Sequence, residues 1–187
     1  MPAATLRLLN LLTLLVWPLL VWLALTQPHW QELFWLLALL FGLRWLQLRR
    51  QKNAMGAVMG WLALLGALLC ISSQLLRAQH LLLWYPVAVN LAMLLVFGAS
   101  LWSAMPLVER IARLHEPELP AAAVPYTRRV TQIWCLFFIG NGSMALYTCL
   151  HGDLRLWTLW NGGISYLLIG VLMGAEWWVR QRVRRKA

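Results

Sequence analysis

The chain has 187 residues, of which 61% are hydrophobic and 12% are charged, with 13 tryptophans and a formal net charge of +10. A soluble domain of this size cannot hide so much apolar surface from water, so the composition excludes a soluble globular protein and favours a lipid bilayer as the solvent. The positive charge alone would fit a nucleic-acid-binding protein, but its placement between apolar stretches does not, and we expect no nucleic-acid partner.

Six apolar stretches are long enough to cross a bilayer, because a hydrocarbon core of about 30 Å needs roughly 20 residues at about 1.5 Å each. Backbone groups in lipid must be hydrogen-bonded within the segment, which requires helices, and runs such as "LLNLLTLLVWPLLVWLAL" lack the alternation of barrel strands. The sequence therefore predicts an all-α integral membrane protein, a bundle of six transmembrane helices in a single domain over residues 1–187. The predicted spans are about 8–26, 30–48, 54–76, 81–105, 130–150 and 156–178.

Basic residues divide unevenly between the loops that connect these stretches. With the N-terminus inside, fourteen of the sixteen lysines and arginines lie on the inner side, and the outer loops hold only Arg77 and Arg155. This bias predicts that both termini are cytoplasmic. The C-terminal "RQRVRRK" is then a topology anchor and a contact for anionic lipid rather than an RNA site. The first stretch is expected to remain as a helix, because its apolar run is too long for a signal peptide and no small-x-small cleavage site follows it.

The longest polar interruption, residues 106–125, separates the fourth and fifth spans. Its first part places apolar residues on one helical face and charged residues on the other, which predicts a short amphipathic helix lying in the cytoplasmic interface. Pro106 begins this helix, and later prolines keep it from reaching the next span, so an extended return to Tyr126 is expected. The apolar face holds Leu107, Val108, Ile111 and Leu114, the charged face holds Glu109, Arg110 and Arg113, and the later prolines are Pro117, Pro120 and Pro125.

The polar groups deepest in the predicted spans are amides. Asn90 and Asn141 each fall roughly 13–17 Å inside their helices by rise per residue, near the midplane, and Asn161 lies nearer the outer side beside Gly162 and Gly163. One interpretation is hydrogen bonding between helices, worth about 1 kcal/mol for each amide. The other is that the three asparagines line a cleft for a long, mostly apolar ligand and bind its few polar atoms.

The last span carries a carboxylate, Glu176, near its inner end. We expect it to pair with Arg180 one turn later, and the alternative is a carboxylate that faces a substrate. Tryptophans near the ends of the spans fit an interfacial aromatic belt. These tryptophans are Trp157, Trp160, Trp177 and Trp178.

Histidines and cysteines were considered as metal ligands. Each outer loop holds one histidine, and three converging histidines with a nearby carboxylate could bind zinc, but their spacing is not that of a ligand motif, and we expect neither metal nor cofactor. The cysteines lie within spans without CxxC spacing and are interpreted as packing residues. The histidines are His29, His80 and His151, and the cysteines are Cys70, Cys135 and Cys149.

Four motifs stand out in the second half of the chain: "WYPVAVN" (84–90), "VERIARLHEPELP" (108–120), "YTRRVTQIWCLFFIGNGSMA" (126–145) and "LWTLWNGGISYLLIGVLMGAEWWVR" (156–180). With these motifs the chain resembles a family of small, poorly characterised inner-membrane proteins. That family is encoded in the aryl-polyene and xanthomonadin-type pigment clusters of Gram-negative bacteria. The resemblance covers about residues 84–180, whereas residues 1–80 match only in hydrophobicity, and the "W..FF..N" core is also similar to the septation-protein-A family.

The resemblance implies an inner-membrane accessory protein in the synthesis, transfer or export of a polyene-type lipid or pigment, with no established catalytic residues to carry over. Its cytoplasmic-side residues form a docking candidate for an acidic acyl carrier protein or a polyene synthase enzyme, and the alternative is that the arginines only face anionic lipid headgroups. The docking candidates are Glu109, Arg110, Arg113, Tyr126 and Arg129. The other matching residues are Glu116, Pro117, Thr127, Thr131, Trp134, Asn141, Trp160, Asn161, Gly162, Tyr166 and Glu176.

Three functions fit these features. The favoured one is a non-enzymatic accessory protein that handles an apolar intermediate or scaffolds cytoplasmic partners, with membrane lipids and other membrane subunits as further partners. The alternative is a small lipid transporter or flippase component, which needs a polar track. A membrane acyl- or glycosyltransferase is the least favoured, because no GxSxG, HExxH, P-loop or dinucleotide fingerprint occurs. Its base would be Glu109, His115 or Glu116.

Overall fold

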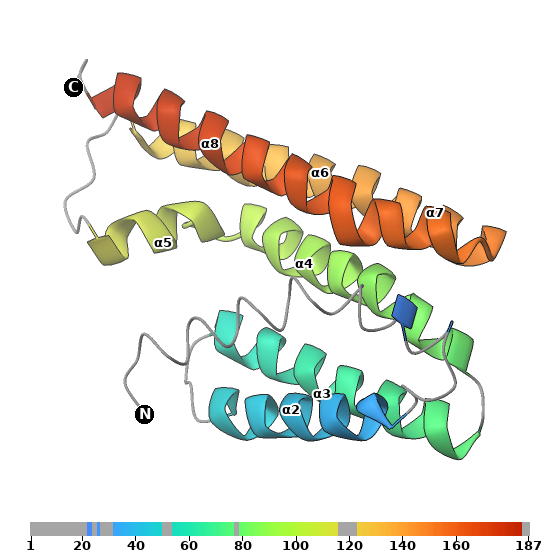
Figure 1. The fold of residues 1–187 in the computed structure, drawn as a ribbon. Helices are drawn as coiled ribbons and strands as arrows, with labels where there is room; N and C mark the ends of the chain where they lie inside the picture. The colour runs from blue at the N-terminus through green and yellow to red at the C-terminus, as the bar shows by residue number, and fades with distance from the viewer. Residues whose placement is uncertain are drawn as a thin grey trace.

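A computed structural model describes residues 22–23, 26, 32–49, 54–76, 79–115 and 123–184, and this part of the chain is helical without strands (Figure 1). The predicted first span, at about 8–26, lies almost wholly outside the described residues. The described helices are α2 (Leu33–Leu48), α3 (Ala54–Leu75), η2 (Gln79–Trp84), α4 (Tyr85–Leu101), α5 (Leu107–His115), α6 (Ala123–His151), α7 (Leu154–Leu159), η3 (Trp160–Ile164) and α8 (Ser165–Arg184).

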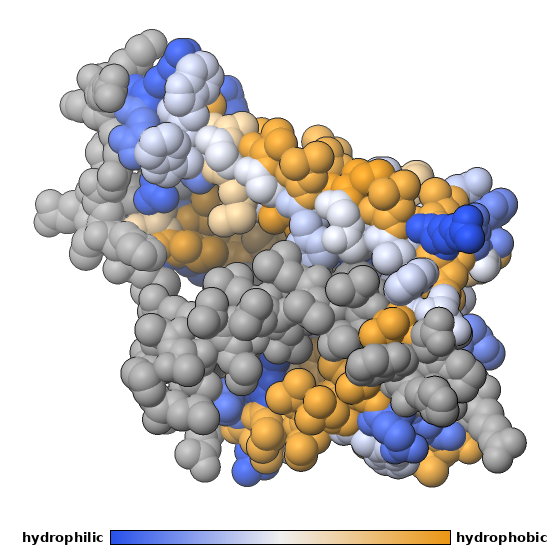
Figure 2. All heavy atoms as spheres, viewed as in Figure 1, coloured by the Kyte–Doolittle hydropathy of each residue, from blue (hydrophilic) through white to orange (hydrophobic). Residues whose placement is uncertain are grey.

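Four stretches of helix in the described chain are long and apolar enough to cross a membrane, and α2 is a shorter apolar helix. Figure 2 shows hydrophobic residues over the middle of the α6–α8 part and hydrophilic residues toward its two ends, as expected for helices that cross a bilayer. The four stretches are Gly56–Leu75, His80–Leu101, Ala123–His151 and Leu154–Arg182.

Two helix pairs make up most of the described structure. Helix α2 lies along α3, and α4 lies along α6 (Figure 1). A glycine permits the close approach within each pair, since an added Cβ at Gly66 would lie 3.1 Å from the ring of Phe41, and one at Gly142 would lie 3.0 Å from Cβ of Asn90. Small residues at such crossings are the usual means of bringing membrane helices together.

The two pairs are joined at the end of the bundle that contains η2. The ring of Phe41 on α2 lies 5.5 Å from that of Tyr85 at the start of α4. Trp157 on α7 is fully buried in the same cluster, and its Nε1–H donates to the carbonyl of Leu83 at 3.0 Å. The prediction that Trp157 belongs to an interfacial belt is therefore wrong, and this side chain fills the core between the two helix pairs.

A single methyl group at the α4–α6 contact should measurably destabilise the fold. We expect Gly142→Ala to cost about 1–3 kcal/mol, because the new Cβ meets the Cβ of Asn90, which cannot move without moving α4. Gly140→Ala on the same helix is the matched control, since an added Cβ there meets no atom within 4 Å, and it should be neutral or slightly stabilising. Thermal unfolding in detergent, followed by circular dichroism, measures both; equal melting temperatures would contradict the tight crossing.

Helix α5 forms where the amphipathic pattern places it, and Glu109 is the residue whose burial departs from the predicted faces. Glu109 has the spacing of the charged face and is 2% exposed, whereas Arg110 of that face is exposed. On the apolar face, Leu107 is buried and Ile111 is 44% exposed. Packing of α5 against α4 and α6 decides its rotation and buries Leu107, Glu109 and Ala112. An outward-facing isoleucine is tolerated because lipid, rather than water, can cover it.

The segment between α5 and the next span also differs from expectation. Helix α6 begins at Ala123, so Pro125 lies inside its first turn and does not prevent the helix. Proline is tolerated there because the first backbone N–H groups of a helix have no intrahelical acceptor. Tyr126, expected at the end of an extended return, is helical, and residues 116–122, with Pro117 and Pro120, lie outside the described part.

Candidate functional site

Asn141 is the centre of a buried hydrogen-bond cluster that joins three helices. Its Nδ2 donates to Oδ1 of Asn90 on α4 at 3.0 Å. Its Oδ1 accepts from Nε1 of Trp160 at 3.2 Å and from Oγ of Ser165 at 2.7 Å. Asn90 in turn donates from Nδ2 to the carbonyl of Pro86 at 2.8 Å. The amide of Asn141 therefore fixes α4, α6 and the last span against one another.

The π-turn η3 places Trp160 and Ser165 on the same side of the last span. Residues five apart lie roughly 140° apart around an ordinary α-helix. Here the N–H of Ser165 bonds to the carbonyl of Trp160, the i→i+5 pattern of a π-turn. Both side chains can consequently reach one oxygen of Asn141. The sequence signal was the "WNGG" string, which pointed to close backbone packing but not to this turn.

Asn161 belongs to the same region but not to the Asn141 cluster. Its Nδ2 donates to Oγ1 of Thr148 at 3.2 Å and to the carbonyl of Trp157 at 3.0 Å. Its Oδ1 is buried and has no hydrogen-bond partner among the described residues. The structure thus brings Asn90 and Asn141 into direct contact and gives Asn161 separate partners.

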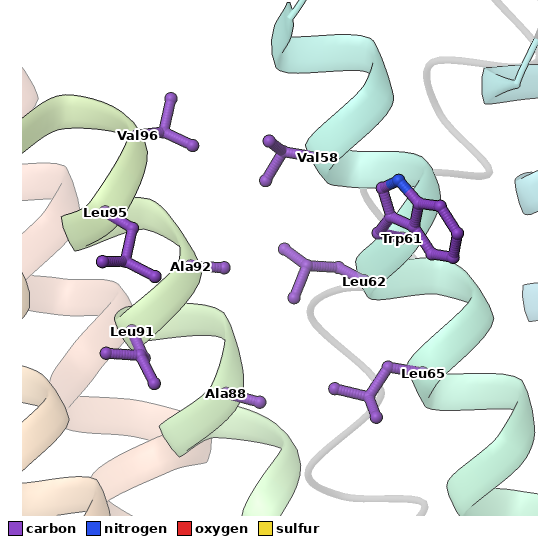
Figure 3. Close-up of a pocket in the computed structure, with 9 residues that line it drawn as sticks. All are labelled: Val58, Trp61, Leu62, Leu65, Ala88, Leu91, Ala92, Leu95 and Val96. Carbon is purple, nitrogen blue, oxygen red and sulfur yellow. The ribbon is translucent and has the colours of Figure 1, made fainter. Parts of the chain in front are cut away.

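An apolar cleft separates α3 from α4, on the side of each helix away from its own partner. Its volume is about 410 Å³, and it contains almost no polar surface. Figure 3 shows Val58, Leu62 and Leu65 of α3 pointing toward Ala88 and Ala92 of α4 across the gap. The described residues that line it are Val58, Trp61, Leu62, Leu65, Ala88, Leu91, Ala92, Leu95 and Val96.

None of the three asparagines is among the lining residues of this cleft. Asn90 lies on α4 with its side chain bonded to Asn141, away from the cleft, and the cleft offers hydrocarbon contacts only. That the asparagines bind a ligand therefore stays a prediction. Sequence reasoning missed the cleft because its lining residues are ordinary span residues, and nothing in their pattern says which helices are neighbours.

The predicted docking candidates are largely engaged in bonds within the chain. Arg113 donates from Nε and Nη2 to Oε1 of the buried Glu109 at 2.9 and 2.8 Å. Arg110 donates from Nε to the carbonyl of Met105 at 2.9 Å, and the hydroxyl of Tyr126 donates to the carbonyl of Glu176 on α8 at 3.0 Å. Of the five candidates, Arg110 and Arg129 are the exposed ones.

Two unpredicted residues tie α4 to its neighbours near this surface. Oγ of Ser100 accepts from the backbone N–H of Leu107 at 3.0 Å. Arg128 on α6 donates from Nη2 to the carbonyl of Leu101, the last residue of α4, at 2.8 Å. A cation at a helix C-terminus is favoured by the helix dipole and satisfies a free carbonyl. Arg128 is therefore a cap for α4 rather than a free surface charge.

Other predicted positions take less specific places. Among the described residues the structure shows one salt bridge, Arg113–Glu109, and the expected bond between Glu176 and Arg180 is not formed. Within the described part, no three histidine, cysteine or acidic side chains form a metal-binding group. The exposed His80 and His151 belong to this part, whereas His29 lies outside it.

The tight turn between α6 and α7 carries its own sequence signals. Gly152 adopts a φ of 76°, which favours glycine, and ends α6. Asp153 then caps α7, its Oδ1 accepting from the backbone N–H groups of Arg155 at 2.8 Å and Leu156 at 3.2 Å. These hydrogen bonds lower the pKa of the Asp153 carboxyl, and the bond from the N–H of Leu156 has the larger effect.

This cap should contribute pH-dependent stability. Because its pKa is lowered in the folded state, the contribution of Asp153 is complete above the ordinary carboxyl pKa and is lost as the pH falls through the lowered value. We expect Asp153→Ala to melt at a lower temperature than the wild type at pH 7, with a smaller difference in acid, where the protonated carboxyl caps without its charge. Asp153→Asn keeps a capping oxygen but not the charge, so at pH 7 it should melt between the wild type and Asp153→Ala. A difference for Asp153→Ala that is as large in acid as at pH 7 would contradict the assignment.

Comparison with known proteins adds no relative, since no protein-family model, curated protein or solved structure matches the chain. The proposed function therefore rests on two features of the described structure. One is the apolar cleft between α3 and α4, and the other is the buried amide cluster centred on Asn141.

Proposed function

We propose that this protein is a non-enzymatic helical membrane protein that holds the hydrocarbon chain of a lipid in the cleft between α3 and α4. The observation that carries the proposal is the lining of the cleft, which is apolar throughout and lies within two helices long enough to span a membrane. From Val58 to Leu65 the cleft extends along seven residue steps of α3, or roughly 10 Å. A cleft of this length and chemistry fits part of an acyl or polyene chain and offers nothing to a polar headgroup.

The surrounding solvent makes a lipid chain the favoured occupant. Leu91 and Leu95 line the cleft and are also exposed at the molecular surface, so a chain can enter sideways from the bilayer. On α3 the lining residues lie in the half that begins at Ala54, which is the cytoplasmic half under the topology that the basic residues predict, and on α4 they lie around the middle of the helix.

The narrower biological role is part of the same proposal. We place the protein in the bacterial inner membrane as an accessory to the synthesis, transfer or export of a polyene-type lipid or pigment. The sequence resemblance over residues 84–180 supports this role, and the excess of inner basic residues supports cytoplasmic termini. A flippase would need a free polar track, and the bonding of Asn90 to Asn141 gives that alternative less support.

Filling the cleft tests the proposal. Ala88 and Ala92 point into the gap (Figure 3), so Ala92→Phe, alone or with Ala88→Phe, should exclude the chain. We expect a several-fold drop in lipid retained per protein after purification in mild detergent, measured by lipid mass spectrometry. Ala175→Phe is the matched control, because Ala175 is exposed on α8 and far along the chain from the cleft lining. Unchanged retention in a well-folded Ala92→Phe protein would contradict the proposal.

A further inference from the structure

The buried Oδ1 of Asn161 is an acceptor that has no donor among the described residues. Asn161 is 5% exposed, and its Oδ1 has no partner in this part of the chain, although the side-chain oxygens of Asn90 and Asn141 have donors. An acceptor left unsatisfied in hydrocarbon costs several kcal/mol. Such an atom in a stable fold therefore indicates a donor beyond the described residues.

The orientation of this amide is fixed, so the free atom is the oxygen. Nδ2 faces the carbonyl of Trp157, which can only accept, and Oγ1 of Thr148. That hydroxyl donates its own proton to the carbonyl of Ala145 at 2.9 Å and so also accepts from Asn161. Turning the amide over would set Oδ1 against a carbonyl oxygen and leave Nδ2 free instead.

The position of Asn161 limits what the partner can be. The residue lies in the π-turn, seven steps or roughly 10 Å inside the span that begins at Leu154. Turns of this type widen the helix and recur at functional sites. No cationic residue lies within the π-turn or in α6 beside Thr148, and an isolated cation at this depth would be costly. A neutral hydrogen-bond donor fits this position, because it adds no charge at this depth and needs only the space of one hydrogen bond.

We infer that the π-turn Trp160–Ile164 is a binding site for one hydroxyl group, which donates its proton to Oδ1 of Asn161. The hydroxyl belongs either to an internal water molecule or to a lipid of the bilayer. This site is independent of the cleft between α3 and α4, since it lies on the last span and shares no residue with the cleft lining. It gives the protein a polar recognition point that the apolar cleft lacks.

Solid-state NMR of asparagine-labelled protein in two kinds of liposome tests the site. The measurement is the cross-peak between the side-chain carbonyl carbon of Asn161 and a hydroxyl proton other than that of Thr148, whose own cross-peak is identified by its loss in Thr148→Val. Phosphatidylcholine has no hydroxyl and phosphatidylglycerol has two. A cross-peak in both kinds of liposome supports the site with water as the donor, and one in phosphatidylglycerol alone supports it with a lipid hydroxyl. A cross-peak in neither would overturn the inference.

The same spectra contain a control. Asn141 should show its cross-peak to the hydroxyl of Ser165 in either lipid, because its donor is part of the chain. Asn161→Ser assigns the Asn161 signal by its loss. If that variant fails to fold, Thr148→Val assigns the signal instead, by shifting it while leaving Oδ1 in place.

Discussion

Replacing Trp157 by alanine should cost about 3–5 kcal/mol of folding stability, among the largest effects of any single change in the described structure. The side chain is fully buried where η2, α2 and α4 meet α7, so its removal opens a cavity between the two helix pairs. It also leaves the carbonyl of Leu83 without the indole N–H that it accepts at 3.0 Å. Unfolding in mixed detergent, followed by circular dichroism, measures the loss.

Two variants separate the contributions of Trp157. Trp157→Phe keeps most of the apolar volume and removes the hydrogen bond, and it should cost about 1–3 kcal/mol. Trp177→Ala on α8 is the matched control, because Trp177 is 62% exposed, and its removal should change stability by less than about 0.5 kcal/mol. Similar losses for Trp157→Ala and Trp177→Ala would refute the core position of Trp157.

Replacing Asn141 by leucine should destabilise the bundle by about 2–4 kcal/mol. Three side-chain hydrogen bonds are lost, to Asn90, Trp160 and Ser165, and each such bond between membrane helices contributes about 0.6–1.7 kcal/mol. The leucine also leaves the indole N–H and the serine hydroxyl without their acceptor. The same unfolding experiment measures the effect.

A control and a double-mutant cycle make this second result specific. Ser143 is exposed on the same helix, and Ser143→Ala should leave stability unchanged. Combining Asn90→Ala with Asn141→Ala should cost less than the sum of the two single changes, because the two amides bond to each other. Strict additivity would show that the bond contributes nothing. Lipid retention per folded molecule should stay constant in the Asn141 variants if the amides are structural, and a selective loss of lipid would instead favour the ligand-lining prediction.

Among the described residues, the sequence was sufficient to predict that the apolar stretches are helical and where the short amphipathic helix α5 lies. Runs of apolar residues require helices in lipid, and α5 combines apolar and charged residues at helical spacing. The short turn from α6 to α7 could also have been predicted, since Gly152 and Asp153 are a helix stop followed by a helix start.

The rotation and packing of the helices could not be predicted in the same way. In a membrane span, apolar side chains face both lipid and core, so hydrophobicity does not distinguish the two sides. The burial of Trp157 and the exposure of Trp177 illustrate this, because both residues fit an interfacial belt by position. The burial of Glu109 on α5 has the same origin, since helix contacts rather than the sequence pattern decide that rotation.

The hydrogen bonding of the buried asparagines was predicted in part from the sequence. Depth along the spans predicted that Asn90 and Asn141 each lie near the midplane. Hydrogen bonding between helices was one of the two interpretations, and the bond between the two amides agrees with it. The hydrogen bonds that Trp160 and Ser165 donate to Asn141 could not be predicted, because they depend on the π-turn that rotates both side chains toward α6. The "WNGG" string indicated close packing at this position but not the i→i+5 hydrogen-bond pattern.

Photocrosslinking from the cleft tests the central claim most directly. A photoreactive residue in place of Leu91, which lines the cleft and is 55% exposed, is activated in intact membranes, and the adduct is identified by mass spectrometry. The proposal predicts a lipid-chain adduct that is lost when Ala92→Phe fills the cleft and persists with Ala175→Phe. An adduct to another segment of this chain, such as residues 8–26, would show that protein occupies the cleft and would contradict the lipid-holding function.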